Sequence, residues 1–440
     1  MLAAGMVFMV EWNPLVHHLS SWATPGDLWG MVRAAHYVQW GFLGGIYTPS
    51  NGIVTFPGMA ILLSPAAWLS ENLHLTESFL PFFLPRPTAA FVFEPLEILL
   101  AATVVFASDA LAEHLGVSHR RRIALCVSVG VLAWPTAAVW GHAEDALAMT
   151  FALYALVALM DGRWSGVGWL LGVGIVIQPL VALLVPLVVA AAPSGRRVAV
   201  TVRSAVISVF LVGVAFAGDA KDTYRALVTQ PTPPSVNHAT PWVGLAPRVS
   251  SGGGPISHAV TVVPGLGHPV LTATTASSPV TLVSGGPGRL IDILLILLLS
   301  FYVWRRPQPP VTVLWLAALV LASRCFFEAV MTPYYLAPPL MLALVMTARL
   351  GARRFWTAAI LSLELSVFAY HHLEPWVWWL PIVSGLSVIL ALGYPGPHRA
   401  VDTSVEDEPV ATSQPDLRDG PGRRPLESIR REHDDELASV

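Results

Sequence analysis

The sequence predicts an all-α polytopic membrane protein, and three observations carry that prediction. Of its 440 residues, 54% are hydrophobic and only 12% are charged, a balance too apolar for an ordinary soluble domain. Apolar runs recur along the chain and approach the roughly 20 residues that a helix needs to cross the hydrocarbon core of a bilayer. Arginines collect in short clusters between these runs. The net charge of −3 averages over this pattern and therefore indicates nothing about partners.

Twelve apolar runs are the predicted transmembrane helices. In chain order they cover residues 3–16, 90–112, 123–140, 146–160, 166–177, 179–192, 198–217, 290–304, 311–329, 334–348, 355–370 and 376–394. The first run is short and lacks both the basic flank and the cleavage site of a signal peptide. We expect residues 1–394 to form one transmembrane domain. Residues 395–440 are polar and poor in aromatics, so we expect a disordered cytoplasmic tail.

The arginine clusters set the expected orientation. If the spans are as given, the clusters fall on one side of the membrane, and basic residues favour the cytoplasm. They are Arg120 to Arg122, Arg163, Arg196 with Arg197, Arg305 with Arg306, and Arg349 with Arg353 and Arg354. We therefore expect a multi-pass protein of the plasma membrane with two large outer segments, 17–89 and 218–289. The second is rich in Pro, Gly, Ser and Thr and should be mostly loop.

Two further helices are expected on the outer side, lying in the interface. Residues 52–69 are apolar enough to cross, but counting them as a crossing breaks the arginine pattern, so we interpret them as a re-entrant or interfacial helix. In the stretch 24–41, helical spacing places Trp29, Arg33, His36 and Trp40 on one face. Asp27 stands at the start of this helix, where it could cap the helix or face solvent.

The stretch WGHAED places three ionisable groups, His142, Glu144 and Asp145, between two apolar runs. Charged groups at membrane depth usually face a cavity or pathway, which favours a functional site. The alternative is that the two acids simply interact with the N-terminus of the next helix, a favourable place for negative charge. Other candidate substrate contacts are spread over the outer segments and span ends: Arg33, His36, Gln178, His238, Arg324, Glu328, Tyr334 and His371.

The sequence contains no motif that indicates a dedicated metal site or a cofactor. His371 and His372 are adjacent, so in a helix they would point about 100° apart, and no HxxxH, CxxC or DxD spacing occurs. The glycine-rich stretch at residues 251–255 lacks the Lys and Ser/Thr of a nucleotide-binding loop. We therefore expect no cofactor, no metal and no nucleic-acid partner.

Ordered landmarks between Asp27 and Glu374 resemble a known class of enzyme. They are GD at residues 26–27, IYTPSNGIVTFPGMAILLSP at 46–65, WGHAED at 140–145, NHATPWVGLAP at 237–247 and MTPYYLAPPL at 331–340. In this order they are similar to landmarks of the GT-C glycosyltransferases, closest to the bacterial mannosyltransferase branch, family 87. Each landmark alone is weak, and their order carries the resemblance. It implies a GT-C-like helical bundle that takes a sugar from a polyprenyl-phosphate donor.

The resemblance also implies roles for particular residues. Asp27 matches the acid that acts as general base in the first outer loop, and His142, Glu144 and Asp145 would line the cavity for the donor and the acceptor. Two positions depart from the family pattern. Relatives often place a basic residue where this chain has Gln178, and Gly58 stands where they have a second proline. Phosphate binding would then fall to Arg324, Arg225 or a histidine, and the identity of the sugar stays open, with mannose implied.

The implied reaction is an inverting displacement outside the cell. A carboxylate such as Asp27 would take the proton of an acceptor hydroxyl, on a lipid or glycan, as it attacks the anomeric carbon. His142, Arg324 and Tyr334 could stabilise the departing lipid phosphate. The rival interpretation is a transporter or flippase of lipid-linked sugars, which predicts ionisable residues in mid-span and two related halves. Most polar groups of this chain instead gather at one face, while a scaffold without chemistry would leave them without a purpose.

Overall fold

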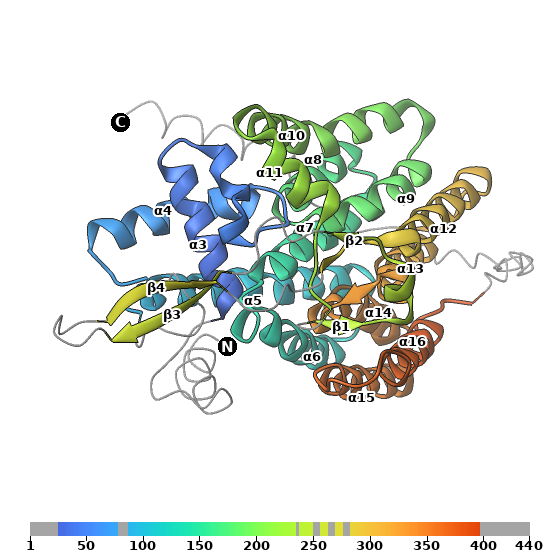
Figure 1. The fold of residues 1–440 in the computed structure, drawn as a ribbon. Helices are drawn as coiled ribbons and strands as arrows, with labels where there is room; N and C mark the ends of the chain where they lie inside the picture. The colour runs from blue at the N-terminus through green and yellow to red at the C-terminus, as the bar shows by residue number, and fades with distance from the viewer. Residues whose placement is uncertain are drawn as a thin grey trace, which may run out of the picture. The chain divides into compact units, whose positions relative to one another are not determined.

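The computed structural model describes residues 25–77, 87–234, 237–249, 256–262, 269–275 and 282–396 (Figure 1). Helices dominate these residues, as the sequence predicts, and the few strands are short. The predicted span at residues 3–16 lies outside the described residues, and so does the predicted tail from residue 397 onward.

Ten helices of the described residues coincide with predicted spans. They are α5 (Ala90–His114), α6 (His119–Ala138), α7 (Ala143–Met160), α8 (Trp164–Ile177), α10 (Arg197–Gly218), α12 (Gly286–Arg305), α13 (Pro310–Phe327), α14 (Ala337–Leu350), α15 (Ala352–Phe368) and α16 (Pro375–Leu392). Among them α5, α7, α10, α12, α13 and α16 are long and apolar enough to cross a membrane. Membrane character is thus supported by the structure, whereas the full set of twelve crossings stays a prediction.

The predicted span at residues 179–192 is not one continuous α-helix. The chain forms a 3-10 helix, η4 (Pro179–Leu183), and then the short helix α9 (Leu184–Ala191). A proline lacks the backbone donor of a helix and drives the preceding residue to an extended conformation. Gln178 is extended, with φ −144° and ψ 117°. The α8–η4 junction is therefore a sharp corner that directs the Gln178 side chain sideways from the helix.

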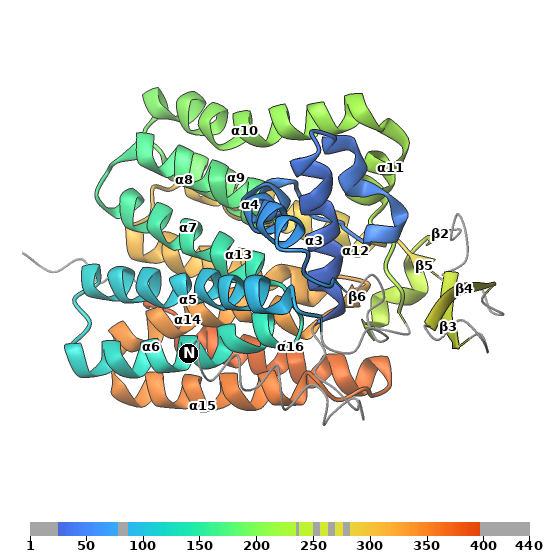
Figure 2. The same cartoon turned by 90° about the vertical axis from the view of Figure 1, so that its left-hand side faces the viewer.

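Helix α7 lies inside the bundle. It packs against α5 and α8, while α6, α14 and α13 surround the same region (Figure 2). In its apolar window 78% of the residues are buried, against 22% in α10. Alanines at several positions allow neighbouring helices to approach closely, as small residues do in membrane bundles. The first turn of α7 is consequently enclosed by protein.

Helices α3 (Gly26–Gln39) and α4 (Gly58–Asn72) pack against each other on the N-terminal side of the chain. Helix α4 corresponds to the predicted interfacial helix at 52–69. Its 15 residues make it shorter than the helices that are long enough to cross a membrane. The placement of α3 in the interface stays a prediction, and the two tryptophans of its predicted face differ in burial. Trp29 is buried, edge-on to Phe93 of α5 at 6.4 Å between ring centroids, whereas Trp40 at the far end is exposed.

The segment 218–289, expected to be mostly loop, contains short regular elements. They are α11 (Ala220–Tyr224), the π-helical turn η6 (Arg225–Thr229), β1 (His238–Ala239), the 3-10 helix η7 (Pro241–Leu245), β2 (Arg248–Val249), β3 (Ile256–Val262), β4 (Pro269–Thr275) and β5 (Leu282–Val283). Strands β2 and β5 pair antiparallel, as do β3 and β4. Strand β1 pairs antiparallel with β6 (Val330–Met331). This last pairing ties the segment to the 3-10 helix η8 (Pro333–Leu336) that precedes α14.

The remaining short 3-10 helices are η2 (Leu43–Tyr47) and η3 (Pro49–Asn51), between α3 and α4, and η5 (Ser194–Arg196), before α10.

The arginine-rich helix ends contact one another at one end of the bundle. Arg121, after the α5–α6 turn, donates to the carbonyl of Ala348 at 2.5 Å, near the end of α14. Arg197, at the start of α10, lies 4.1 Å above the ring of Trp304 near the end of α12. The α5–α6 and α7–α8 turns lie together at the left of Figure 2. The clusters that the sequence predicts on one side therefore lie at one end of the molecule.

Candidate functional site

The chain enters α7 through a turn at Gly141, a position that only a glycine fits. Gly141 has φ +72°, a left-handed conformation that residues with a Cβ rarely adopt. A Cβ at this position would lie 2.9 Å from the backbone nitrogen of Leu28 in α3. The turn thus brings the start of α7 against the start of α3, and His142 follows directly.

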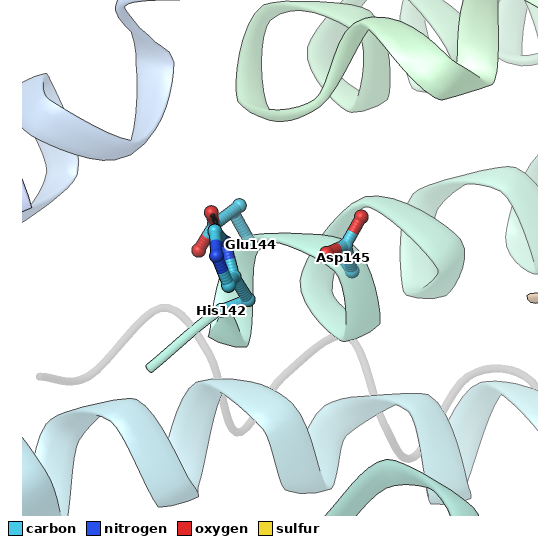
Figure 3. Close-up of side chains that lie close together, drawn as sticks. All are labelled: His142, Glu144 and Asp145. Atoms are coloured by element: carbon cyan, nitrogen blue, oxygen red, sulfur yellow. Dashed lines mark hydrogen bonds and ion pairs between the residues drawn. The ribbon is translucent and has the colours of Figure 1, made fainter. Parts of the chain in front are cut away.

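The imidazole of His142 lies between two carboxylates, one buried and one exposed. Its Nδ1 is 2.5 Å from Oε1 of Glu144, and its Nε2 is 3.1 Å from Oδ2 of Asp27. The side chain of Asp27 is 61% exposed, while that of Glu144 is 2% exposed. Figure 3 shows how His142 and Glu144 face each other at the helix start. The structure therefore brings Asp27, 115 residues earlier in the chain, into contact with the His-Glu-Asp trio.

These neighbours favour a charged imidazole. Burial lowers the pKa of His142, whereas Tyr334, Glu144 and Asp27 raise it, and the net result is a pKa well above the ordinary value. Both ring nitrogens then donate, each to a carboxylate. Glu144 and Asp145 both lie in the first turn of α7, a favourable place for negative charge, so the alternative interpretation of these two acids also fits the structure.

An aromatic wall closes one side of His142. The ring of Tyr334 lies 4.4 Å from the His142 ring, centroid to centroid, at an angle of 32°. Trp140 lies edge-on to Tyr334 at 5.8 Å and stacks on Tyr370 at 6.1 Å. The indole N–H of Trp140 donates to the hydroxyl of Tyr370 at 3.3 Å. Tyr334 was a predicted site residue, whereas Tyr370 was not, because it reaches the site only through the packing of α15.

The carboxyl group of Asp145 accepts from the amide of Gln178, at the position where the family that the sequence resembles often has a basic residue. Nε2 of Gln178 donates to Oδ1 of Asp145 at 2.9 Å, and the hydroxyl of Thr55 donates to Oε1 of Gln178 at 3.2 Å. The extended backbone before Pro179 gives Gln178 this reach. Gln178 is a neutral donor, so its contact with Asp145 is a hydrogen bond and not an ion pair.

Cations lie beyond Asp145, around Glu328. The guanidinium of Arg324 lies 3.7 Å above the ring of Tyr335, and its Nε is 3.5 Å from Oε2 of Glu328. Nε of Arg289 donates to Oε1 of the same carboxylate at 2.9 Å. Arg324 is also near enough to Asp145 to interact with it electrostatically. Arg324 and Glu328 were predicted site residues, and Arg289, in the first turn of α12, extends this group.

The predicted residues Arg33 and His36 line a different feature, a cavity of about 550 Å³ beside α3 and α4. Nε2 of His36 is 2.9 Å from Oε1 of Glu77, and Nε of Arg33 donates to Oδ1 of Asn51 at 3.3 Å. Burial lowers the pKa of His36, but hydrogen bonding and charge from Glu77 raise it, so the pKa ends above its ordinary value. These two residues are therefore engaged with partners other than the trio.

His238 and His371 also have other partners. The ring of His238 stacks on Trp378 at 4.3 Å and on His372 at 4.4 Å. Burial, assisted by His372, lowers the pKa of His238 to about 4, so this imidazole is neutral at physiological pH. Nδ1 of His371 is 3.2 Å from the carbonyl oxygen of Phe368, on an exposed side chain. Among the described residues, neither His238 nor His371 contacts His142. Their roles in substrate binding stay predictions.

Two acids of α5 complete the site and escaped the sequence analysis. Glu94 and Glu97 are both buried, and Oε2 of Glu97 accepts from the backbone N–H of Ala143 at 3.3 Å, the first residue of α7. Such donors at a helix N-terminus lack partners within the helix and favour negative charge. The signal was present in the sequence, because FEPLE places two acids inside a long apolar run.

The trio meets the spatial requirement for holding a cation. One ligand atom from each of His142, Glu144 and Asp145 lies within 4.8 Å of the other two. The two acids are adjacent in sequence and lie on one helical turn. This spacing matches none of the usual metal-binding sequence motifs. Chemically, the site combines an accessible carboxylate, a charged or metal-binding imidazole, buried carboxylates and a nearby guanidinium.

Comparison of the chain with protein-family models, with curated proteins and with solved structures gave no match. The functional argument therefore depends on the geometry of the site and on the sequence landmarks alone.

Proposed function

We propose that this protein is a membrane glycosyltransferase that transfers a hexose, mannose by resemblance, from a polyprenyl-phosphate donor to a lipid or glycan acceptor at the outer face of the plasma membrane. The contact between Asp27 and His142 is the observation that carries the proposal. It joins an accessible carboxylate to a largely buried imidazole at the end of the bundle opposite the arginine clusters. That end would face the outside if the clusters face the cytoplasm.

In the proposed reaction Asp27 is the general base. Its carboxylate is exposed enough to reach an acceptor hydroxyl, and one of its oxygens stays oriented by His142 Nε2. The acceptor oxygen forms a bond to the anomeric carbon as its proton passes to Asp27. The bond between that carbon and the phosphate oxygen breaks, and the phosphate leaves as an anion with inversion at carbon. A positioned base of this kind contributes about a hundred- to ten-thousand-fold in rate.

Groups on the other side of His142 suit the departing phosphate. The hydroxyl of Tyr334 and the N–H groups of Arg324 are donors, and fixed donors at the place where charge develops stabilise a transition state. A lipid phosphate departs without protonation, so no general acid is required. The polyprenyl tail would remain among the apolar helices.

The test is sugar transfer by purified protein supplied with radiolabelled polyprenyl-phosphate mannose. Asp27→Asn removes the base with almost no change in volume, so we expect transfer to fall by about a hundred- to ten-thousand-fold. The matched control is Asp161→Asn, since Asp161 lies at the opposite end of α7 and pairs with Arg163 and His114. Undiminished transfer by the Asp27 variant, with an unchanged gel-filtration profile, would contradict the proposed role.

A transporter or flippase of lipid-linked sugars is the second candidate, and the buried acids of α5 favour it. Glu94 and Glu97 lie in a helix long and apolar enough to cross the membrane, and ionisable residues there often mark substrate or proton pathways. The candidates differ in one measurement. A flippase moves fluorescent lipid-linked sugar across proteoliposomes that contain no acceptor, whereas a transferase leaves the donor intact and in place until an acceptor is added.

A further inference from the structure

Three side chains at the start of α7 carry atoms that can bind a metal ion, and these atoms lie close to one another. One ligand atom from each of His142, Glu144 and Asp145 lies within 4.8 Å of the other two. Figure 3 shows His142 and Glu144 against each other and Asp145 beside them. We propose that these three side chains bind a divalent transition-metal cation, with Asp27 as the carboxylate that orients the histidine.

Unpartnered buried oxygens are the independent observation that favours a ligand. Glu144 and Asp145 are both almost completely buried. Oε2 of Glu144 and Oδ2 of Asp145 have no hydrogen-bond partner among the described residues. A buried carboxylate oxygen without a partner costs free energy, because it loses its hydration and gains nothing in return. A bound cation supplies the missing partner to both acids at once.

The histidine is oriented as a metal-binding histidine usually is. Such a residue almost always donates its second ring N–H to a carboxylate or a carbonyl, which fixes the tautomer. Here Nε2 of His142 faces Oδ2 of Asp27 at 3.1 Å, so Nε2 carries the proton and donates to this carboxylate. Nδ1 then points at Oε1 of Glu144, 2.5 Å away. The cation would take the place of the proton between these two atoms and bind both.

The donor set selects among metals. One imidazole nitrogen and two carboxylate oxygens suit Zn²⁺ or Mn²⁺, whereas Ca²⁺ and Mg²⁺ prefer oxygen ligands alone. Glu97 adds a further buried carboxyl group beside Ala143. Arg324 also interacts with Asp145, but its Nε lies 3.5 Å from the carboxylate of Glu328. Glu328 pairs with Arg289 as well. The balance around the three ligands is therefore negative, as a cation site requires.

The site would also suit the donor, although this part rests on the proposed function. A three-ligand site leaves coordination positions open, and a phosphate oxygen of the lipid-linked sugar could fill one. Asp27 would then face the acceptor while its partner His142 holds the cation. The binding of the cation itself requires no sugar transfer and is tested without a substrate.

The experiment uses the full chain, purified in detergent, stripped with a chelator and titrated with Mn²⁺. Electron paramagnetic resonance follows the free ion, and equilibrium dialysis repeats the titration with Zn²⁺. We expect saturable, stoichiometric binding that Asp145→Asn and Glu144→Gln abolish and Asp161→Asn leaves unchanged. Asp27→Asn should retain the site but weaken it about 10- to 100-fold, the usual effect of removing a carboxylate behind a metal-bound histidine.

A second measurement requires no variant and is therefore independent of whether the variants fold. Bound Mn²⁺ in the unaltered protein should show the nitrogen hyperfine coupling of a directly bound imidazole. Absence of saturable binding, or binding without that coupling, would overturn the proposal and indicate that protons satisfy the acids. Chelator-insensitive transfer by a chain that binds no metal would overturn the site while the transferase proposal stands. Saturable binding by a chain with no transfer activity supports the site and counts against the transferase alone.

Discussion

Asp27 and Glu144 contact opposite nitrogens of the same imidazole and differ in access to water. Asp27 is 61% exposed and Glu144 is 2% exposed. In the proposed reaction an acceptor hydroxyl can therefore approach only Asp27. Burial keeps Glu144 as a fixed partner of His142. The two acids are chemically similar, but they come from different helices. Asp27 is exposed in the first turn of α3, whereas Glu144 is buried in the first turn of α7, and this difference in burial gives them different roles.

A second histidine provides the pH dependence of stability at the residue scale. His36 faces Glu77 through Nε2 and Gln39 through Nδ1, at 2.9 and 3.2 Å. Its pKa in the folded chain is raised above the ordinary 6.5. A raised pKa means that the charged form stabilises the fold fully below about pH 6.5 and that this contribution is lost as pH rises through the folded pKa. We expect the melting temperature to fall over this interval.

The measurement compares thermal unfolding of the wild type and Glu77→Gln between about pH 5.5 and 8.5, the range in which a histidine titrates. The variant removes the main group that raises the pKa, so its melting temperature should change less with pH. Glu113→Gln serves as the control, because Glu113 is exposed and pairs with Arg122 instead. Parallel pH profiles of the wild type and the Glu77 variant would contradict this assignment.

At the scale of elements, close contact between α4 and α8 explains why a glycine stands at position 58. A Cβ on Gly58 would overlap the carbonyl group of Val176, near the end of α8. A proline, which the family that the sequence resembles has at this position, would meet the same obstacle. The glycine thus lets the start of α4 lie against the corner that positions Gln178.

We predict that Gly58→Ala destabilises the protein by about 1–3 kcal/mol, the usual cost of overpacking a close contact. Gly213→Ala is the matched control, because a Cβ at that helical position of α10 meets nothing within 4 Å. Replacing that glycine should stabilise the helix by about 0.5–1 kcal/mol. Thermal unfolding of both variants in the same detergent gives the comparison, and equal melting temperatures would refute the packing argument.

Particular elements show what the sequence could and could not predict. Long apolar runs between arginines predicted α5, α10 and α12 to within a few residues, because length and composition decide such helices. The spans 166–177 and 179–192 also predicted the turn at Gln178. The sequence did not predict that the second span starts as the 3-10 helix η4 before it continues as α9, because its apolar composition is the same throughout. The β3–β4 hairpin was missed because residues 218–289 show little periodicity. Such pairing depends on contacts between residues far apart in the chain.

The candidate site was predictable only in its parts. WGHAED indicated the trio, and the resemblance indicated Asp27, but their contact depends on the turn at Gly141 and on how α3 packs. His371 was grouped with the trio by its outer position, yet it lies beside Phe368. Glu97 could have been found by asking why an apolar run contains acids. Its contact with Ala143 depends on the packing of α5 against α7 and is not visible in either sequence segment.

At the scale of the whole bundle, the proposal requires the two ends to face opposite sides of the membrane. Ser194 lies at the arginine-rich end and Glu374 precedes α16 beyond the α15 end; both are exposed. We predict that Glu374→Cys reacts with a membrane-impermeant maleimide on intact cells, while Ser194→Cys reacts only after permeabilisation. The half-buried Cys126 is replaced by alanine in both variants, and Cys325 is buried. The reverse labelling pattern would place the candidate site in the cytoplasm and exclude the proposed orientation.

The broken segment after α8 has a consequence for the surrounding lipid. Helix α8 has 14 residues, and η4 and α9 have 5 and 8. At about 1.5 Å per residue in an α-helix and about 2.0 Å in a 3-10 helix, the two segments measure about 21 and 22 Å. A hydrocarbon core is about 30 Å thick, and short helices make the neighbouring leaflets thin or admit water. A lipid headgroup beside these two segments would lie deeper in the bilayer than elsewhere around the protein, at the level of the corner that carries Gln178. The chain could thus lower a lipid-borne phosphate toward Asp145 by local deformation of the bilayer, without pulling the lipid out of it.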